Sequence, residues 1–311
     1  MPRPTISALV LLVPIALLAG CGSGPSSRPN ERGAGSTPPF GPEAVGAALG
    51  ASLVAQPAGV WQATLPRDDL HISRGPTPVQ PSFDQEAEVD FLPSPGSAQT
   101  ALMGEIPSTE AEAEKLVPAL GAAGFTVTAV HHHITMLTPP VEWTHFTAAG
   151  DAVGLARKLH DVVQQTTATP LPAKEGAKDT TLPAPQLAST LGGESQVSDG
   201  VVEVSVDRGD QISMGGRAVP SGFGLDGLVY FEPLPGGQAA TTGEVCLVGA
   251  EVPPVLTALE KAGLIVTALH SHMLDTAPPT FFLHWWGTGS PTTLATQIRG
   301  ALDQANFPKK G

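Results

Sequence analysis

The sequence predicts an α+β protein made of two copies of one two-layer unit, in which helices cover one face of an antiparallel sheet. Three observations lead to this prediction. The chain repeats itself after 139 positions, each copy has the element order strand, helix, strand, strand, helix, and 35 Gly and 32 Pro occur in 311 residues. So much Gly and Pro is typical of short elements joined by many turns.

The duplication is clearest where residues 104–158 align with residues 243–297 without a gap. Within the first 53 of these pairs, 19 are identical. A period above about 100 residues indicates a pair of domains, because solenoid repeats are about 20 to 50 residues long. We therefore predict repeat units at 42–165 and 184–305, joined by a Thr- and Pro-rich linker at 166–183.

The N-terminus has the pattern of a lipoprotein signal peptide. A basic head precedes an apolar stretch from Ser7 to Leu18, which is too short to cross a hydrocarbon core of about 30 Å as a helix. The small residues before Cys21 suit cleavage in front of that cysteine. We expect residues 1–20 to be removed, Cys21 to carry a lipid that holds the protein on a membrane, and residues 21–41 to form a flexible tether.

The predicted location is therefore the cell envelope, facing outside the cytoplasm. The chain has 16 Lys and Arg against 29 Asp and Glu, a net charge of −13, which argues against nucleic acid as a partner. After lipidation Cys246 would be the one remaining thiol, so no internal disulfide can form. We expect Cys246 in the core of a strand.

The first half of each unit is interpreted as short strands separated by Pro and Gly. In the first unit, extended runs are predicted at 59–65, 70–73 and 87–92, with a further strand at 100–106. A helix follows in each unit.

Thr109 with Glu112 three residues later forms a capping-box pattern, and apolar residues recur at helical spacing up to Gly124. Pro118 conflicts with this helix, because an interior proline usually kinks or ends one. In the second unit the prolines fall at 253–254, where a helix can begin.

The second half of each unit is interpreted as a hairpin across a Pro-Pro pair, followed by a closing helix. The predicted ranges are 125–133, 141–147 and 152–163 in the first unit, and 264–272, 280–286 and 291–302 in the second. The complete order resembles most of a ferredoxin-like sandwich. Another two-layer α+β fold with extra N-terminal strands is the alternative.

Six of the nine histidines lie at matched positions in these hairpins. They are His131, His133 and His145 in the first unit, and His270, His272 and His284 in the second. Residues two apart on a strand face the same side. If each hairpin is symmetric about its prolines, the second histidine of each pair lies opposite the third, and three imidazoles converge in each unit.

Three histidines with an open fourth position are the arrangement of many Zn²⁺ and copper sites. Glu105 and Glu244 follow matched glycines on the adjoining strand, where they would supply a fourth ligand or accept a hydrogen bond from an imidazole. Two other interpretations stay open: a polar pocket for a small ligand, and structural histidines that cap a core stripe. The matched pairs Arg67/Asp69 and Arg208/Asp210 are interpreted as structural turns.

A binding protein is favoured over an enzyme, because the sequence has no nucleophile elbow, no phosphate-binding glycine loop with a following Lys, and no HExxH or CxxC motif. We predict an envelope-anchored lipoprotein with a histidine-lined site for a metal ion or small ligand in one or both units. The alternatives are a metal-dependent hydrolase, with Glu105 or Glu244 as base near a metal-activated water, and a structural envelope module without a ligand.

The same residues resemble a known family. Gly-Glu, a helix, Ala-Gly-(Phe/Leu)-x-Val-Thr-Ala-(Val/Leu)-His-x-His, a Pro-Pro pair and an aromatic-rich strand with a histidine are similar to the LppY/LpqO family of bacterial envelope lipoproteins, a tandem domain of unknown function. The resemblance covers both units and is strongest over residues 210–302. Between the paired histidines this chain has His132 and Ser271, where family members usually have Asn. The resemblance implies an exported or lipid-anchored protein and brings no established activity.

Overall fold

The computed structural model describes residues 40–167 and 176–309. Residues 37–311 form one compact unit, so both repeats belong to the same body. The predicted signal peptide, Cys21 and residues 21–39 of the predicted tether lie outside the described residues. Within the described ranges, no helix combines the length and the apolar character that crossing a membrane requires.

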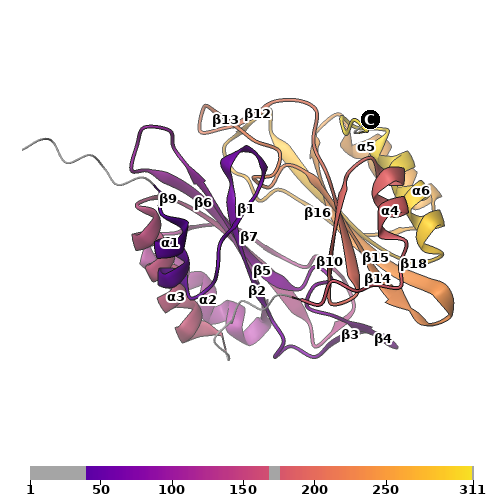
Figure 1. Cartoon of the computed structure of the whole chain (residues 1–311), viewed down its shortest axis with the longest axis horizontal. Coiled ribbons are helices and arrows are strands. Elements are labelled where there is room, and N and C mark those ends of the chain that lie inside the picture. Colours follow the sequence, from indigo (N-terminus) through magenta and orange to yellow (C-terminus); the bar gives the residue numbers. More distant parts are fainter. Residues whose placement is uncertain (1–39, 168–175, 310–311) are drawn as a thin grey trace, which may run out of the picture. The chain divides into compact units, whose positions relative to one another are not determined.

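Each repeat contains a six-stranded antiparallel sheet (Figure 1). The first sheet has the order β1-β2-β5-β6-β9-β7, with strands Val54–Ala55, Trp61–Pro66, Glu86–Pro93, Thr100–Thr109, Val141–Gly150 and Thr126–His131. The second has the order β10-β11-β14-β15-β18-β16, with strands Glu194–Ser198, Val201–Val206, Gly227–Leu234, Gln238–Val248, Thr280–Gly289 and Ile265–His270. The two orders correspond strand for strand, in agreement with a duplicated domain.

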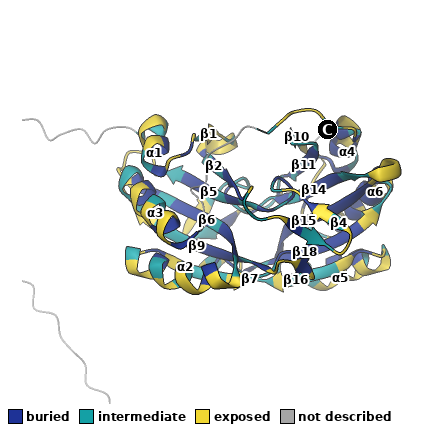
Figure 2. Ribbon diagram, turned by 90° about the horizontal axis from the view of Figure 1, so that it is seen from below, coloured by how far each residue is buried: buried dark blue, intermediate teal, exposed yellow. Residues whose placement is uncertain are grey.

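Three helices accompany each sheet, on the side away from the other repeat (Figure 2). They are α1 (Pro42–Leu49), α2 (Glu110–Ala123) and α3 (Ala152–Thr166), and then α4 (Ala184–Leu191), α5 (Val252–Lys261) and α6 (Pro291–Leu302). Two three-residue 3₁₀ turns, η1 (Pro57–Gly59) and η2 (Pro235–Gly237), complete the helical elements of the described ranges.

The predicted capping box at the start of α2 is present. The side chain of Thr109 accepts a hydrogen bond from the Glu112 backbone, and Glu112 accepts one from the Thr109 backbone. Gly124 ends the helix in the left-handed region, with φ of 92°. Pro118 lies inside a continuous helix. Burial of Leu116 and Leu120 against the sheet favours the helix despite the backbone donor that proline lacks.

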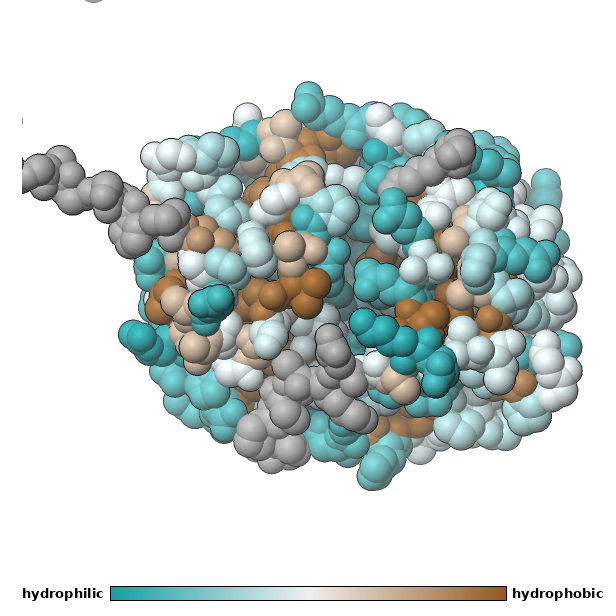
Figure 3. Space-filling view, in the orientation of Figure 1, coloured by the Kyte–Doolittle hydropathy of each residue, from teal (hydrophilic) through white to brown (hydrophobic). Residues whose placement is uncertain are grey.

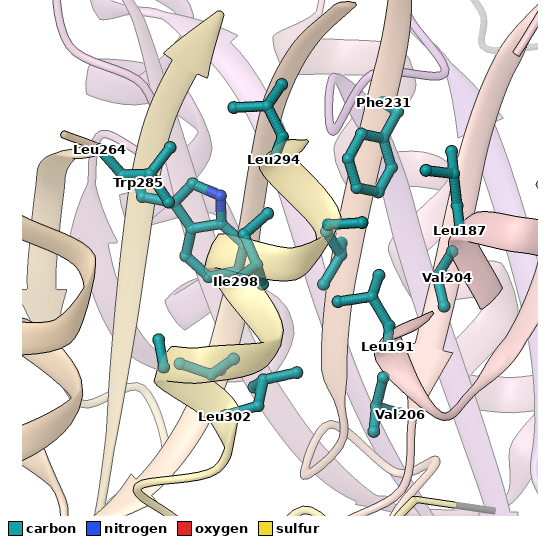
Figure 4. Close-up of a cluster of buried hydrophobic side chains, with 14 of the residues drawn as sticks. Leu187, Leu191, Val204, Val206, Phe231, Leu264, Trp285, Leu294, Ile298 and Leu302 are labelled. Atoms are coloured by element: carbon teal, nitrogen blue, oxygen red, sulfur yellow. The ribbon is translucent and has the colours of Figure 1, made fainter. Parts of the chain in front are cut away.

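A hydrophobic core fills the space between helices and sheet in each repeat. In the second repeat, Leu187 and Leu191 of α4 pack with Ile298 and Leu302 of α6 over Trp285 of β18 (Figure 4). Burying each such side chain stabilises the fold by about 1.5–3 kcal/mol relative to exposure. The corresponding core of the first repeat includes Leu49, Leu116, Phe146 and Leu159.

The opposite sheet faces take part in clusters that both repeats share. Each repeat contributes a small three-stranded sheet: β4-β3-β8 (Thr77–Val79, Ile72–Arg74, Leu137–Thr138) and β13-β12-β17 (Arg217–Val219, Ile212–Met214, Thr276–Ala277). One shared cluster packs Phe83 against Trp286, with ring centroids 5.9 Å apart. The other packs Met103 with Phe223 and Phe282. Neither repeat therefore buries its apolar surface alone.

Candidate metal centre

Strand pairing places a carboxylate beside a histidine in each repeat. On β6 and β9, Glu105 is the direct cross-strand partner of His145, and on β15 and β18, Glu244 is the partner of His284. The glycine before the first glutamate is sterically required, since a Cβ at Gly104 would lie 2.8 Å from the Phe146 ring. The matched Gly-Glu dipeptides are therefore part of the site's architecture.

In the first repeat, two imidazoles lie close to His145. Its Nε2 atom is 2.9 Å from Nε2 of His131, the last residue of β7, and 3.3 Å from Nε2 of His133. The ring of His133 stacks on Trp143 at a centroid distance of 4.3 Å. All three of these histidines thus come together.

In the second repeat, His270 ends β16 and its ring stacks on His284, with centroids 5.2 Å apart. His272 packs edge-on against Phe282, with centroids 3.7 Å apart. Phe282 of the aromatic strand β18 therefore lies directly beside a histidine of the second repeat.

The two sets of histidines meet each other. Nδ1 of His145 lies 2.8 Å from Nδ1 of His272. The rings of His131 and His270 lie 3.5 Å apart between centroids, and the ring of His133 stacks on His284 at 4.2 Å. The sequence predicted one set per repeat, whereas the structure forms one cluster from both, here called the histidine centre.

The predicted hairpin register is wrong. Ala129, and not His133, is the cross-strand partner of His145, because β7 carries an irregularity between Val127 and Ala129 and ends at His131. Moreover, the segment before the Pro-Pro pair forms β8, which pairs with β3. His131 still reaches His145, since it lies two residues beyond Ala129 and therefore on the same face.

Three carboxylates border the histidine centre. Oε2 of Glu105 lies 3.4 Å from Nδ1 of His145, and Oε2 of Glu244 lies 3.2 Å from Nε2 of His284. The third is Asp84, with Oδ2 3.2 Å from Nδ1 of His133. The duplication gave no signal for Asp84, because the corresponding left-handed turn of the second repeat contains Gly224.

Five of the six imidazoles are held in their neutral form. Burial lowers the pKa of His131 to about 3 and that of His272 to about 4. Burial also lowers the pKa of His133, His145 and His270, and the charges of neighbouring histidines add to the effect. Neutral imidazole is the form that binds metal ions.

The carboxylates divide into two kinds. Burial, with the charges of other carboxylates, raises the pKa of Asp84 and Glu105 well above the usual range. Burial also opposes ionisation of Glu244, yet His272 and His284 outweigh it and lower the pKa of that carboxyl. Glu244 is therefore the anionic group of the centre.

Several imidazole nitrogens are buried without a hydrogen-bond partner: both of His270, both of His284, and Nε2 of His272. Among the described residues, four sets of side chains have ligand atoms within 4.8 Å of one another. They are His131/His133/His284, His131/His145/His270, Glu105/His133/His145 and Glu244/His270/His284. Since Zn²⁺ binds nitrogen at about 2.0–2.1 Å, such groups can hold a metal ion.

The other singled-out residues lie outside the centre. His132 points away and contacts the Val141 carbonyl through Nδ1 at 2.7 Å. Arg67 pairs with Asp69 at 2.8 Å and also with Glu112, so it joins a turn to the start of α2. Arg208 does the same with Asp210 and Glu251 at α5.

Cys246 is fully buried within β15, as predicted.

Comparison with known families gives two matches along the chain. The model of the Domain of Unknown Function (DUF1259) matches residues 43–165 and 185–304. The chain belongs to the DUF1259 family. Each DUF1259 match contains one matched trio of histidines and one of the glutamates, so the histidine centre is built from two copies of the family domain.

Among curated proteins, none matches this DUF1259 chain. Solved structures with similarity include the trimeric bacterial microcompartment shell protein PduB, at 14% identity, TM-score 0.20, covering 80% of this chain and 88% of that one. EtuB from Clostridium kluyveri follows at 12% identity, TM-score 0.19, covering 81% and 90%. At these TM-scores the likenesses support no conclusion about fold or function.

Proposed function

We propose that this DUF1259 protein binds Zn²⁺ or copper at the histidine centre and is anchored to the cell envelope by lipid on Cys21. The observation that carries the metal proposal is the environment of His145. Its two ring nitrogens lie 2.9 Å and 2.8 Å from nitrogens of His131 and His272, which belong to different repeats.

A purely structural role fits these histidines poorly. A buried polar atom without a partner costs about 1–3 kcal/mol, and His270 leaves both ring nitrogens without a hydrogen-bond partner. A metal ion would use such nitrogens as ligands and remove that cost. The ionised Glu244 would offset part of the charge of the ion.

The donor set favours the two metals named. Imidazole suits Zn²⁺ and copper, whereas Mg²⁺ and Ca²⁺ prefer sites built from oxygen alone. Each of the four candidate sets contains at least two histidines. The carboxylates Glu105 and Glu244 would serve as further ligands or would orient the imidazoles.

The test is metal binding by protein purified without an affinity tag. We expect elemental analysis and calorimetric titration to show tight Zn²⁺ or copper binding by the wild type. His145→Ala should weaken it at least tenfold, because that ring belongs to two of the four sets. His71→Ala is the control, since His71 is exposed and outside every set. Equal, negligible uptake by wild type and both variants would exclude the metal proposal.

The location has its own test. Cys21→Ser should move the protein from the membrane fraction to the soluble exported fraction, because the substitution removes the thiol that would carry lipid. Continued membrane association of this variant would show that the anchor lies elsewhere. Membership of the LppY/LpqO group of envelope lipoproteins is part of the same proposal, supported by the motif with its paired histidines.

A metal-dependent hydrolase is the second candidate. It is favoured by a cavity whose lining includes Glu105, Glu244 and three histidines of the centre, so a carboxylate base and ligand nitrogens share one space. Glu244, whose carboxyl has the lowered pKa, is the candidate base, so Glu244→Gln should lose hydrolysis of a test ester and still bind metal through the sets that lack Glu244. If the metal-loaded wild type hydrolyses no test ester, the hydrolase proposal is wrong and only the metal-binding function remains.

The fold is proposed to be ferredoxin-like in its central part. In each sheet, β6, β7 and β9 (or β15, β16 and β18) with two helices provide the arrangement strand, helix, strand, strand, helix. β5 lies beside β6 and supplies the fourth strand from the N-terminal side.

A further inference from the structure

A cavity of about 370 Å³ adjoins the histidine centre. Its lining includes His133, His145 and His272 at one part and the exposed residues Pro57 and Ala58 at another. The cavity therefore connects the centre with solvent. Figure 3 shows a hollow near the middle of one molecular face.

Carboxylates dominate the lining of this cavity, here called the acidic chamber. They are Asp84, Glu88, Asp90 and Glu105 of the first repeat, and Glu203, Asp207, Asp226 and Glu244 of the second. Arg208 is the one Lys or Arg side chain in the lining. Its guanidinium lies 2.6 Å from Asp210 and 2.8 Å from Glu251, so its charge is already paired outside the chamber.

The chamber carboxylates repel one another, both within the second repeat and across the repeat boundary. Burial and the charge of Asp226 raise the pKa of Glu203 to about 7, and burial and Asp226 also raise that of Asp90 to about 8. The histidines that line the chamber stay neutral and supply no counter-charge. Once Glu203 and Asp90 lose their protons, at about pH 7 to 8 and above, no unpaired positive side chain in the lining balances them, and the chamber then favours a cation from solution.

The spacing of the carboxylates indicates the form of that cation. Within the described ranges, no set of three chamber carboxylates has its oxygen atoms within 4.8 Å of one another, since every such set includes histidines. A bare ion needs several oxygens at about 2.0–2.6 Å. The chamber is therefore too wide to strip an ion of its water and suits a cation that keeps its water shell.

Where the chamber meets the centre, protein atoms lie in positions to replace the water molecules around a hydrated ion. His272 is 4% exposed, lines the chamber, and its Nε2 atom has no hydrogen-bond partner. Oε2 of Glu244, which also contacts Nε2 of His284, lies 3.8 Å from that nitrogen. These two atoms are potential ligands for an ion at the boundary between the chamber and the centre.

We propose that the acidic chamber holds hydrated divalent metal cations and passes them to the histidine centre. Holding the cations follows from the chamber itself, whereas passing them on rests on the proposed function. A cavity lined by one sign of charge raises the local concentration of counter-ions and speeds their association by factors of about 10 to 1,000.

The holding step is tested with Mn²⁺, whose free form is counted by electron paramagnetic resonance and whose bound waters are detected by proton relaxation. Glu203→Gln/Asp226→Asn removes two chamber charges and leaves every histidine in place. The matched control is Glu114→Gln/Glu260→Gln, which removes two exposed carboxylates from α2 and α5. The single variant Glu203→Gln serves if the double variant melts early.

We expect wild type, the control and His145→Ala to bind Mn²⁺ with water retained, and Glu203→Gln/Asp226→Asn to bind it at least tenfold more weakly. Equal Mn²⁺ affinity in the chamber variant and the wild type would overturn the proposal. Mn²⁺ binding without any uptake of Zn²⁺ or copper would instead support the chamber and exclude the histidine centre as a metal site.

The passing step is tested by stopped-flow mixing with Zn²⁺. The association rate constant should fall severalfold in Glu203→Gln/Asp226→Asn and lose much of its dependence on salt, while the control keeps the wild-type rate. Tight Zn²⁺ binding at an unchanged rate in the chamber variant would show that ions reach the centre by another route.

Discussion

Glu232 is a buried carboxyl on β14, 3% exposed, and burial raises its pKa to about 7. The unfolded chain releases this proton near pH 4.5, so stability falls as pH rises from about 4.5 to about 7. Glu232→Gln should therefore raise the free energy of unfolding at pH 8 by an amount on the order of 1–3 kcal/mol. Urea unfolding at pH 4 and pH 8 measures the effect.

At pH 4 both the folded and the unfolded forms of Glu232 carry the proton, so the variant and the wild type should have nearly equal stability. Glu260→Gln, on an exposed position, is the control and should change little at either pH. A Glu232→Gln variant less stable than wild type at pH 8 would contradict the assignment of a raised pKa.

The sequence predicted most of the chemistry at the residue scale. The histidines and the two glutamates could be found because duplication preserves them at matched positions, and alternation along strands relates their faces. Asp84 could not be found this way, since its counterpart is Gly224. The burial that keeps the imidazoles neutral also depends on side chains from the other repeat, which no local pattern shows.

At the scale of elements, Arg67 joins β2 and its following turn to the N-terminus of α2. Its side chain is fully buried, donates to the Pro107 carbonyl at 2.5 Å, and pairs with Asp69 and Glu112. Arg67→Met should lower the free energy of unfolding by about 3–5 kcal/mol, because it leaves two carboxylates without their partner. Urea unfolding at pH 7 is the measurement.

Arg157→Met provides the comparison, since Arg157 is exposed on α3 and its replacement should change stability by no more than about 0.5 kcal/mol. Arg208→Met should be about as damaging as Arg67→Met, because Arg208 makes the equivalent pairs at α5. Loss of stability in only one of the two would show that the repeats do not use this connection equally.

Helices with a long periodic pattern could be predicted, and the two shortest α-helices could not. α2 follows from its capping box and apolar spacing, and α5 from the prolines at its start, while the ranges of α3 and α6 were also predicted. α1 and α4 have eight residues each and were missed. Gly50 and Gly192, with φ of 86° and 82°, are the signals that mark their ends. Strand register failed because an irregularity in β7 leaves no trace in residue types.

At the scale of the whole described body, each repeat depends on the other. Residues 40–167 expressed alone should associate or aggregate, because separation exposes the apolar residues of the two shared clusters. Mixing them with residues 168–311 should give a one-to-one complex that binds metal. Analytical ultracentrifugation with metal analysis of each species is the measurement.

A stable monomer of either fragment would contradict this dependence, and strong metal binding by such a monomer would place a complete site within one repeat. The 19 identities in 53 aligned pairs of the sequence predicted the duplication. It could not show that the copies share clusters, because the pairing of two surfaces leaves no periodic pattern along either of them.

The meeting of His145 with His272 across the two copies has an evolutionary consequence. An ancestor with a single copy of the domain could build such a centre only as a homodimer, with the centre on its twofold axis. Two copies within one chain are free to differ from each other. Asp84 corresponds to Gly224, and His132 corresponds to Ser271. A symmetric dimer of identical chains could not have such a difference between its two halves.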